Sequence, residues 1–335
     1  VAGTLAHAGF ATVAINVVGH GGGPQGTLTV LRAGHEAVPL PAGGRGVDVD
    51  GNGGIGATEG VSTRAPSPLA LIGSRDGLRQ TTADLMQLVR AIRRGVDVDG
   101  DGRADLDREH IYYFGQSFGG IYGTLLMAID PLVRVGVLNV PGGPIVEIAR
   151  QSRIFRHLVI EQLKQRQTPL LNGQSDFTES IPLPGESPER EPAPGALAIQ
   201  SYFARAEWLT QPANPVAFAP YVRQLPLAGV GPKAVLFQWA VGDRTVSNPT
   251  TAALLAAGQL RPASVLFRHD VLAPGLPDRF KDPHAFLTWT AFPEVHAIGR
   301  AAQEQVARFF LSGGRQIERT LPEFETAGTL PATGH

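Results

Sequence analysis

Ser117 lies in the pentapeptide GQSFG at positions 115–119, directly after the apolar segment HIYYF and before a segment of helical character that ends near Ile129. A serine at a sharp turn between a strand and a helix presents its Oγ above the end of a sheet, where it can act as a nucleophile. Glycines at 115 and 119 would let the neighbouring backbone approach closely. A helix beginning at Phe118 would direct its positive end and the Phe118 N–H toward an oxyanion. The alternative is a purely structural turn.

A serine in such a turn needs a base and an acid that orients the base, in the chain order serine, acid, histidine. Asp243 has the expected place for the acid, because it follows the apolar segment 234–241 in the sequence VGDRTV. The loop after the preceding apolar segment, NVPGG at 139–143, has no carboxylate. We therefore predict Asp243 as the acid. The alternative is a turn or helix-capping residue paired with Arg244.

Three histidines follow Asp243 and compete for the role of base. His269 ends an apolar segment, His284 lies in the loop sequence DPHAFL, and His296 falls about one turn into the last helical pattern. A base has to reach over the ends of the strands from a loop, which favours His284. A histidine in the first turn of a helix is more often a surface or packing residue.

Short apolar segments alternate with helical patterns along most of the chain. We expect a helix over 1–8, a doubly buried strand over 11–18 and, after a long and mostly irregular stretch, a helix over 74–94. Further strands are expected at 110–114, 133–140, 234–241 and 264–268, and further helices at 118–129, 248–257 and 293–311. Such alternation predicts an α/β fold with a mostly parallel sheet and helices on both faces.

Residues 144–230 interrupt this alternation. Two helical stretches flank a loop rich in proline, glycine and acidic residues, at about 168–194. We interpret 144–230 as an inserted cap, 1–143 with 231–314 as the core, and 315–335 as a C-terminal tail. An apolar stripe on the first cap helix, which includes Phe155 and Leu158, would either contact an acyl or aromatic group or dock the cap.

At these motifs the chain resembles the α/β-hydrolases, in the style of bacterial secreted esterases and lipases. The resemblance rests on GQSFGG, the capped insertion, GDRTVSN and PHAFL, and it extends from Val1 to about Gly314. It implies an α/β-hydrolase sheet, with Ser117 as nucleophile, Asp243 as acid and His284 as base.

One part of the resemblance departs from the family. The first recognisable strand, at 11–18, would correspond to the fourth of the family, so that three strands and the loop that supplies a second oxyanion N–H are not seen in this sequence. Gly21-Gly22-Gly23 after His20 mimics an oxyanion motif, but its place after a strand favours an ordinary turn.

An aspartate-rich octamer occurs twice, as GVDVDGNG from residue 46 and as GVDVDGDG from residue 95. Alternating oxygen side chains around a central glycine are typical of EF-hand calcium loops. The first loop offers Asp48, Asp50, Asn52 and, in the twelfth place, Glu59. The second offers Asp97, Asp99, Asp101 and Asp105, but it has Arg108 in the twelfth place, so that its closing ligand would have to be Asp107 or Glu109. We expect structural Ca2+ in at least one loop; the alternative is a pair of turns stabilised by side-chain to backbone bonds.

Composition excludes several classes of protein. The 335 residues are 43% apolar and 18% charged, with a net charge of −1, no cysteine and no apolar run long enough for a membrane span. We therefore expect neither a nucleic-acid partner nor a transmembrane segment. No signal peptide is recognisable at the start, and a weak calcium site would suit an extracellular or cell-surface location.

The residues together favour a serine hydrolase of small-molecule or lipid carboxylic esters that needs no cofactor for its chemistry. An amidase or peptidase would use the same three residues. A non-catalytic, calcium-stabilised surface or adhesion module is the alternative from another class. The oligomeric state is not determined by the sequence.

Overall fold

The computed structural model describes residues 1–48, 51–55, 69–179 and 193–327. Its central sheet has the order β3-β4-β5-β6-β7, in which β3 to β6 are parallel and β7 is antiparallel to β6. These strands are β3 (Tyr112–Gln116), β4 (Val135–Asn139), β5 (Ala234–Ala240), β6 (Ser264–Phe267) and β7 (Glu325–Ala327). The prediction of a mostly parallel α/β sheet is confirmed.

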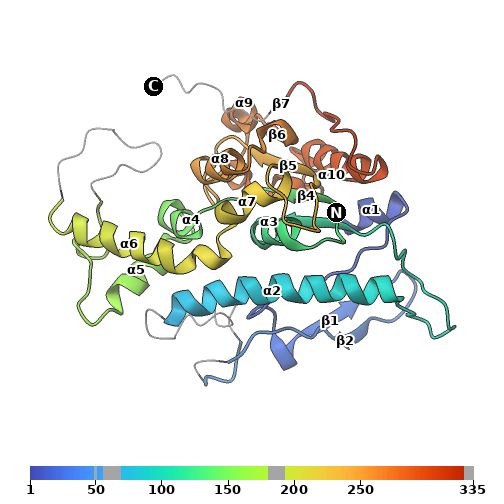
Figure 1. The fold of residues 1–335 in the computed structure, drawn as a ribbon, viewed down its shortest axis with the longest axis horizontal. Coiled ribbons are helices and arrows are strands. Elements are labelled where there is room, and N and C mark those ends of the chain that lie inside the picture. The colour runs from blue at the N-terminus through green and yellow to red at the C-terminus, as the bar shows by residue number, and fades with distance from the viewer. Residues whose placement is uncertain (49–50, 56–68, 180–192, 328–335) are drawn as a thin grey trace.

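The two faces of the sheet pack against different helices. Neighbouring residues of β4 point to opposite sides, so that Val137 belongs to a core with Val306 and Phe309, whereas Leu138 belongs to a core with Leu126 and Leu254. Because both faces are covered, β4 is buried at every position. One layer of helices contains α1 (Ala2–His7) and α10 (His296–Leu311), and the other contains α2 (Leu69–Arg94), α3 (Phe118–Ile129), α7 (Pro215–Arg223) and α8 (Asn248–Ala257) (Figure 1).

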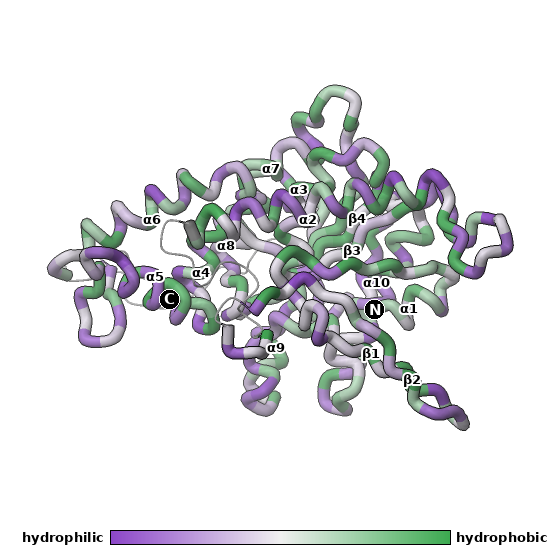
Figure 2. Tube along the Cα trace, turned by 90° about the horizontal axis from the view of Figure 1, so that it is seen from below, coloured by the Kyte–Doolittle hydropathy of each residue, from purple (hydrophilic) through white to green (hydrophobic). Residues whose placement is uncertain are grey.

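Three helices of the expected cap extend from one end of the molecule. They are α4 (Ile145–Gln151), α5 (Arg156–Lys164) and α6 (Ala196–Thr210), and they lie opposite the end that carries α1 (Figures 1 and 2). Val159 and Leu163 form a small separate core with residues of α6, while Ile148 and Phe155 pack toward Val246 and Ile121 of the body. Much of the apolar stripe on the first cap helices therefore packs within the protein.

Helix α7 falls within the expected insertion but belongs to the body. Its residues Ala219 and Val222 are fully buried in the same core as Leu138 of β4 and Leu254 of α8. The chain thus returns to the central layers immediately after the short 3-10 helix η2 (Gln211–Ala213).

The strand expected over 11–18 is wrong. The segment has no assigned strand, most of it is exposed, and its described contacts include a bond from the Val18 N–H to Thr81 Oγ1 at 3.2 Å. A strand requires a neighbour for its N–H and C=O groups, and none of the described strands pairs with this segment. The irregular region after it contains an unexpected hairpin of β1 (Thr27–Val30) and β2 (Val38–Pro41).

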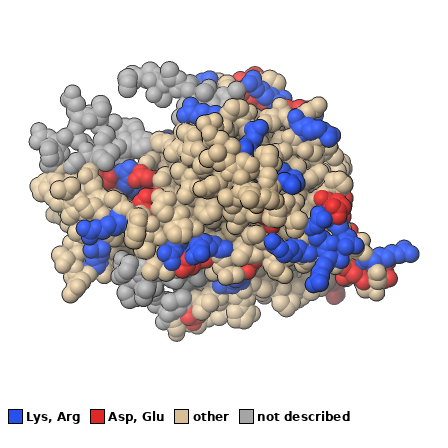
Figure 3. Space-filling view, in the orientation of Figure 1, with Lys and Arg blue, Asp and Glu red and all other residues tan. Residues whose placement is uncertain are grey.

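Shorter elements complete the described chain. They are α9 (His269–Leu272) and the 3-10 helices η1 (Gly23–Gln25), η3 (Arg261–Ala263), η4 (Ala273–Gly275), η5 (Asp278–Phe280) and η6 (Pro283–Thr288). In the part of the chain that the structure describes, no helix has both the length and the apolar character needed to cross a bilayer. On the face in Figure 3, Lys and Arg side chains are more prominent than Asp and Glu, and acidic side chains lie beside several of them.

Candidate active site

Ser117 forms the turn between β3 and α3. Its backbone has φ 52° and ψ −114°, and a positive φ is unusual for a residue other than glycine. The Ser117 N–H donates to the Asn139 carbonyl at 2.8 Å, which anchors the turn to the end of the neighbouring strand β4. A strained strand-to-helix turn of this kind can present a serine Oγ above the end of a sheet.

Two glycines leave room for this turn. A Cβ added at Gly115 would lie 2.3 Å from the Gly119 carbonyl oxygen, and one at Gly120 would lie 2.8 Å from Pro141 Cβ. At Gly119 the nearest atom would be Tyr122 Oη at 3.5 Å, an ordinary contact. The need for glycine at 115 is confirmed, whereas the need at 119 is wrong, because the close approach falls one residue later, at Gly120.

The structure brings Ser117, His284 and Asp243 together. The Ser117 Oγ lies 2.7 Å from His284 Nε2, and His284 Nδ1 lies 2.8 Å from Asp243 Oδ2. Ser117 follows β3, Asp243 follows β5, and His284 belongs to η6 in the loop after β6. Because parallel strands end at the same edge of the sheet, these three loops meet there.

Asp243 is held from two sides. Its Oδ1 accepts the N–H groups of Thr245 at 3.0 Å and of Val246 at 2.8 Å, while Oδ2 faces the imidazole. Its side chain is only 3% exposed. Burial raises the pKa of the Asp243 carboxyl above its ordinary value, and the hydrogen bond from His284 opposes this shift. Asp243 thus also has the alternative role of a turn residue: Oδ1 stabilises the turn, while Oδ2 faces His284.

The two other histidines form no described hydrogen bond with Ser117 Oγ. His296 begins α10, and its Nδ1 lies 2.9 Å from the Pro293 carbonyl oxygen. His269 is 1% exposed between Phe267 and Trp289, and burial lowers its pKa. Only His284 of the three contacts the serine hydroxyl among the described hydrogen bonds.

Phe118 begins α3, so its N–H has no acceptor within the helix, and no described backbone group outside the helix accepts it. The ring of Phe118 lies 5.4 Å from the ring of His20, measured between centroids. The glycine run 21–23 therefore follows directly after a residue that contacts the nucleophile turn. The turn itself comes just before this run, since the His20 N–H donates to the Val17 carbonyl at 3.1 Å, and η1 begins at Gly23.

Tyr113 is a supporting residue that the sequence analysis missed. Its hydroxyl donates to the Gly119 carbonyl at 2.6 Å, and its ring lies against Gly123 so closely that a Cβ there would be 2.3 Å away. The only available indication was a tyrosine in the strand before the turn and a glycine every few residues in the helix after it.

The described parts of the two aspartate loops form matching hydrogen bonds. Asp48 accepts the N–H groups of Gly51 at 2.7 Å and Gly53 at 2.8 Å, and Asp97 accepts those of Gly100 and Gly102 at the same two distances. Bonds from these backbone groups, first of all from Gly102, hold the pKa of the Asp97 carboxyl below its usual value.

The carboxylates of the second loop gather. Oxygens of Asp97, Asp99 and Asp105 lie within 4.8 Å of one another on the surface. The predicted ligand Asp101 is not a member of this described group. Its Oδ1 instead accepts the Arg103 N–H at 2.8 Å. In the first loop, Asp48 and Asn52 are described, whereas the predicted ligands Asp50 and Glu59 lie outside the described residues.

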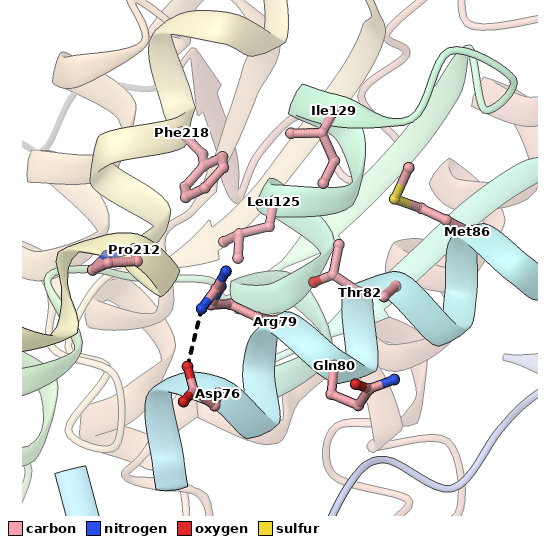
Figure 4. Close-up of a pocket in the computed structure, with 10 residues that line it drawn as sticks. Asp76, Arg79, Gln80, Thr82, Met86, Leu125, Ile129, Pro212 and Phe218 are labelled. Atoms are coloured by element: carbon pink, nitrogen blue, oxygen red, sulfur yellow. Dashed lines mark hydrogen bonds and ion pairs between the residues drawn. The ribbon is translucent and has the colours of Figure 1, made fainter. Parts of the chain in front are cut away.

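A cavity of about 720 Å³ lies between α2, α3 and the segment from η2 to α7 (Figure 4). Leu125, Ile129 and Phe218 form its apolar wall, and an ion pair between Asp76 and Arg79 lies at its edge. Ser117, Asp243 and His284 do not line this cavity, so the cavity is separate from the candidate active site.

No family model matches the chain, and no curated protein matches it in sequence. Three similar solved structures are a puromycin hydrolase, a puromycin-hydrolyzing peptidase of Mycobacterium tuberculosis and acetyl xylan esterase 1 of Thermoanaerobacterium sp.. Their sequence identities to the chain are 13, 15 and 15%, and their TM-scores are 0.38, 0.38 and 0.32.

The matches cover 69, 71 and 64% of this chain, but only 25, 26 and 53% of the puromycin hydrolase, the peptidase and the esterase. The chain therefore spans about a quarter of the length of the first two. Likeness at this level does not extend to activity, and the chemistry has to be argued from the geometry around Ser117.

Proposed function

We propose that the chain is a serine hydrolase of carboxylic esters. Ser117 Oγ attacks the ester carbonyl carbon while His284 Nε2 takes the hydroxyl proton. The tetrahedral intermediate collapses to an acyl-enzyme, and the imidazolium returns the proton to the leaving alcohol. Water then attacks the acyl-enzyme in the same manner, which releases the acid and restores the serine hydroxyl.

One observation carries the proposal: His284 bridges the serine and the acid through its two ring nitrogens, at 2.7 and 2.8 Å. Both distances are those of good hydrogen bonds, and the three residues belong to loops that are far apart in sequence. Asp243 would hold the tautomer with the proton on Nδ1 and stabilise the imidazolium that forms.

The oxyanion would be stabilised by the N–H of Phe118 and by the positive end of α3. The helix is twelve residues long, and its first residue follows the nucleophile directly. In this proposal, Ser117 is the nucleophile, His284 the base, Asp243 the orienting acid and Phe118 one oxyanion donor.

Covalent labelling tests whether the site is reactive at all. A fluorophosphonate should modify the wild-type protein at Ser117 and leave Ser117→Ala unmodified, as read by peptide mass spectrometry. Labelling at another residue, or none in the wild type, would refute the proposed chemistry and favour the non-catalytic surface module.

Substrate panels separate the ester from the amide alternative. We expect turnover of short-chain p-nitrophenyl esters and much slower turnover of matched p-nitroanilides, because an amide has the poorer leaving group. Equal or faster turnover of anilides would assign the site to an amidase or peptidase. Ser117→Ala serves as the background for both substrates.

A further inference from the structure

Asp282 contacts both loops that carry the partners of Ser117. Its Oδ1 accepts the His284 N–H at 3.1 Å and the Arg244 N–H at 3.1 Å, and its Oδ2 accepts the Thr245 hydroxyl at 2.8 Å. His284 lies in the loop after β6, whereas Arg244 and Thr245 lie in the loop after β5. A single carboxylate therefore joins the loop of the base to the loop of the acid.

Thr245 links this carboxylate to that of Asp243. Its N–H donates to Asp243 Oδ1 at 3.0 Å, while its hydroxyl donates to Asp282 Oδ2. Thr245 is 7% exposed, so that water competes little for these bonds. The orientation of the acid and the path of the loop that carries the base are thus coupled through one buried side chain.

The hydrogen bonds between β5 and β6 do not extend to the catalytic side chains. Their described register ends with Ala240 opposite Phe267, three residues before Asp243 and seventeen before His284. A base that is misplaced by about 1 Å costs on the order of 10²-fold in rate. The long excursion after β6 therefore needs an anchor close to His284.

We infer that Asp282 is a positioning residue, which fixes the His284 loop on the Asp243 loop so that the imidazole meets Ser117 Oγ. The inference rests on the proposed function, and it adds a residue that touches none of the reacting atoms. Asp282 acts on the two loops, through two backbone N–H groups and the Thr245 hydroxyl, so its loss should affect turnover more than substrate binding.

Three variants separate the geometry from the charge. Asp282→Ala removes all three bonds. Asp282→Asn keeps an oxygen for the two N–H groups, and its amide can donate to the Thr245 hydroxyl, so that the connection survives without the negative charge. Thr245→Val removes only the hydroxyl bond. Asp278→Ala is the matched control, an exposed aspartate four residues earlier with no described side-chain bond.

We expect Asp282→Ala to lower kcat for a p-nitrophenyl ester about 10- to 100-fold, with KM changed less than about three-fold. Asp282→Asn should recover most of the lost kcat, and Thr245→Val should fall between them. Asp278→Ala should stay within about two-fold of the wild type. In proton NMR spectra, the downfield His284 Nδ1–H resonance should broaden in Asp282→Ala and persist in Asp282→Asn.

Several outcomes would overturn the inference. One is a folded Asp282→Ala protein with wild-type kcat, and another is an Asp282→Asn protein as impaired as Asp282→Ala with an unchanged His284 resonance. If Asp282→Ala does not fold, Thr245→Val and Asp282→Asn carry the same test. Wild-type protein that a fluorophosphonate does not label would refute the proposed function itself, whereas normal labelling with unchanged variants would refute only the role of Asp282.

Discussion

At the scale of single residues, the candidate site combines a strained serine backbone with a desolvated carboxyl group. Ser117 has a positive φ that its surroundings impose, and Asp243 is almost completely removed from water. Strain and desolvation of this kind persist only where neighbouring groups over-determine the conformation. Here the anchors are the Ser117 bond to Asn139 and the two N–H groups that reach Asp243.

The choice of base can be tested by a pair of histidine substitutions. His284→Ala should lower kcat about 10⁴-fold or more, because members of such a triad act as a unit. His296→Ala should leave kcat within a few-fold, since its ring contacts only the Pro293 carbonyl among the described polar partners. Steady-state kinetics on a p-nitrophenyl ester measure both. The reverse result would move the base to α10.

The nucleophile turn provides a second matched pair. Gly115→Ala should destabilise the protein by several kcal/mol, on the order of 3, because its Cβ would overlap the Gly119 backbone. Gly119→Ala should cost less than about 1 kcal/mol, since only ordinary contacts await it and alanine suits a helix. Urea unfolding gives both values. Equal losses would show that the turn relaxes to accommodate a side chain.

At the scale of elements, the junction from α6 to α7 contains an acid whose charge is costly. Glu207 Oε1 accepts from Gln211 at 2.8 Å and also from Asn214, while Oε2 is buried without a partner among the described residues. Burial, together with the nearby charge of Glu147, raises the pKa of Glu207 to about 7, although the Asn214 bond opposes the shift.

This acid predicts how stability depends on pH. The folded protein binds more protons than the unfolded chain between the ordinary pKa near 4.5 and about 7, so its stability should fall as the pH rises through this window. Glu207→Gln should flatten the slope and stabilise the protein by roughly 1–2 kcal/mol at pH 8, after allowance for partial exposure.

Urea unfolding at several pH values from 4 to 8 would measure this slope. Glu161→Gln is the control, because Glu161 is a 55% exposed acid on α5 and should leave the slope unchanged. A Glu207→Gln variant with the wild-type slope would show that Glu207 is ionised in the folded protein as readily as in the unfolded chain.

The second aspartate loop carries the calcium prediction. Three carboxylates within 4.8 Å repel one another, and a bound cation would offset this repulsion. Calcium at one hundred times its Kd would add about 2.7 kcal/mol of stability, so that chelation should lower the Tm by several degrees. Calcium should restore the Tm more effectively than magnesium, and ester turnover of the folded protein should persist without it.

Asp97→Asn should abolish the effect of calcium on Tm, whereas Asp278→Asn, at an exposed aspartate outside both loops, should not. Differential scanning fluorimetry with chelator and added calcium measures both. A Tm that does not respond to chelation in the wild type would leave the octamers as turns closed by aspartate and backbone groups. The expectation of an extracellular or cell-surface location, which rests on the calcium site, would then have no support.

At the scale of the whole molecule, the segment after Gly314 completes the core. β7 pairs antiparallel with β6, and the Arg268 N–H donates to the Phe324 carbonyl at 2.6 Å. Leu321 and Phe324 pack against the core that contains α10, and Glu325 is 6% exposed. The residues expected to form a tail thus include an edge strand of the central sheet.

Phe324→Ala should therefore lower the free energy of unfolding by about 1–3 kcal/mol, through lost apolar burial. Ile317→Ala, at a 38% exposed position in the same segment, should change it by less than about 0.5 kcal/mol. Urea unfolding measures both variants. Equal small effects would show that the segment contributes nothing to the stability of the body.

The sequence by itself determined the local chemistry and the alternation of the elements. The strand-turn-helix around Ser117, the acid after β5 and the loop histidine His284 all followed from patterns within a few residues, because turn geometry and amphipathic periodicity are local. The parallel sheet also followed, since strands that alternate with helices can return only through parallel crossovers.

Only the tertiary structure decided which segments pair or pack with one another. Residues 11–18 have the composition of a buried strand yet form none, whereas 325–327 pair with β6 although nothing local predicted them. Gly120 rather than Gly119, and the bonds of Asp282 across two loops, likewise depend on contacts between segments remote in sequence. Strand pairing and close packing are properties of neighbours in space, and a single sequence does not specify those neighbours.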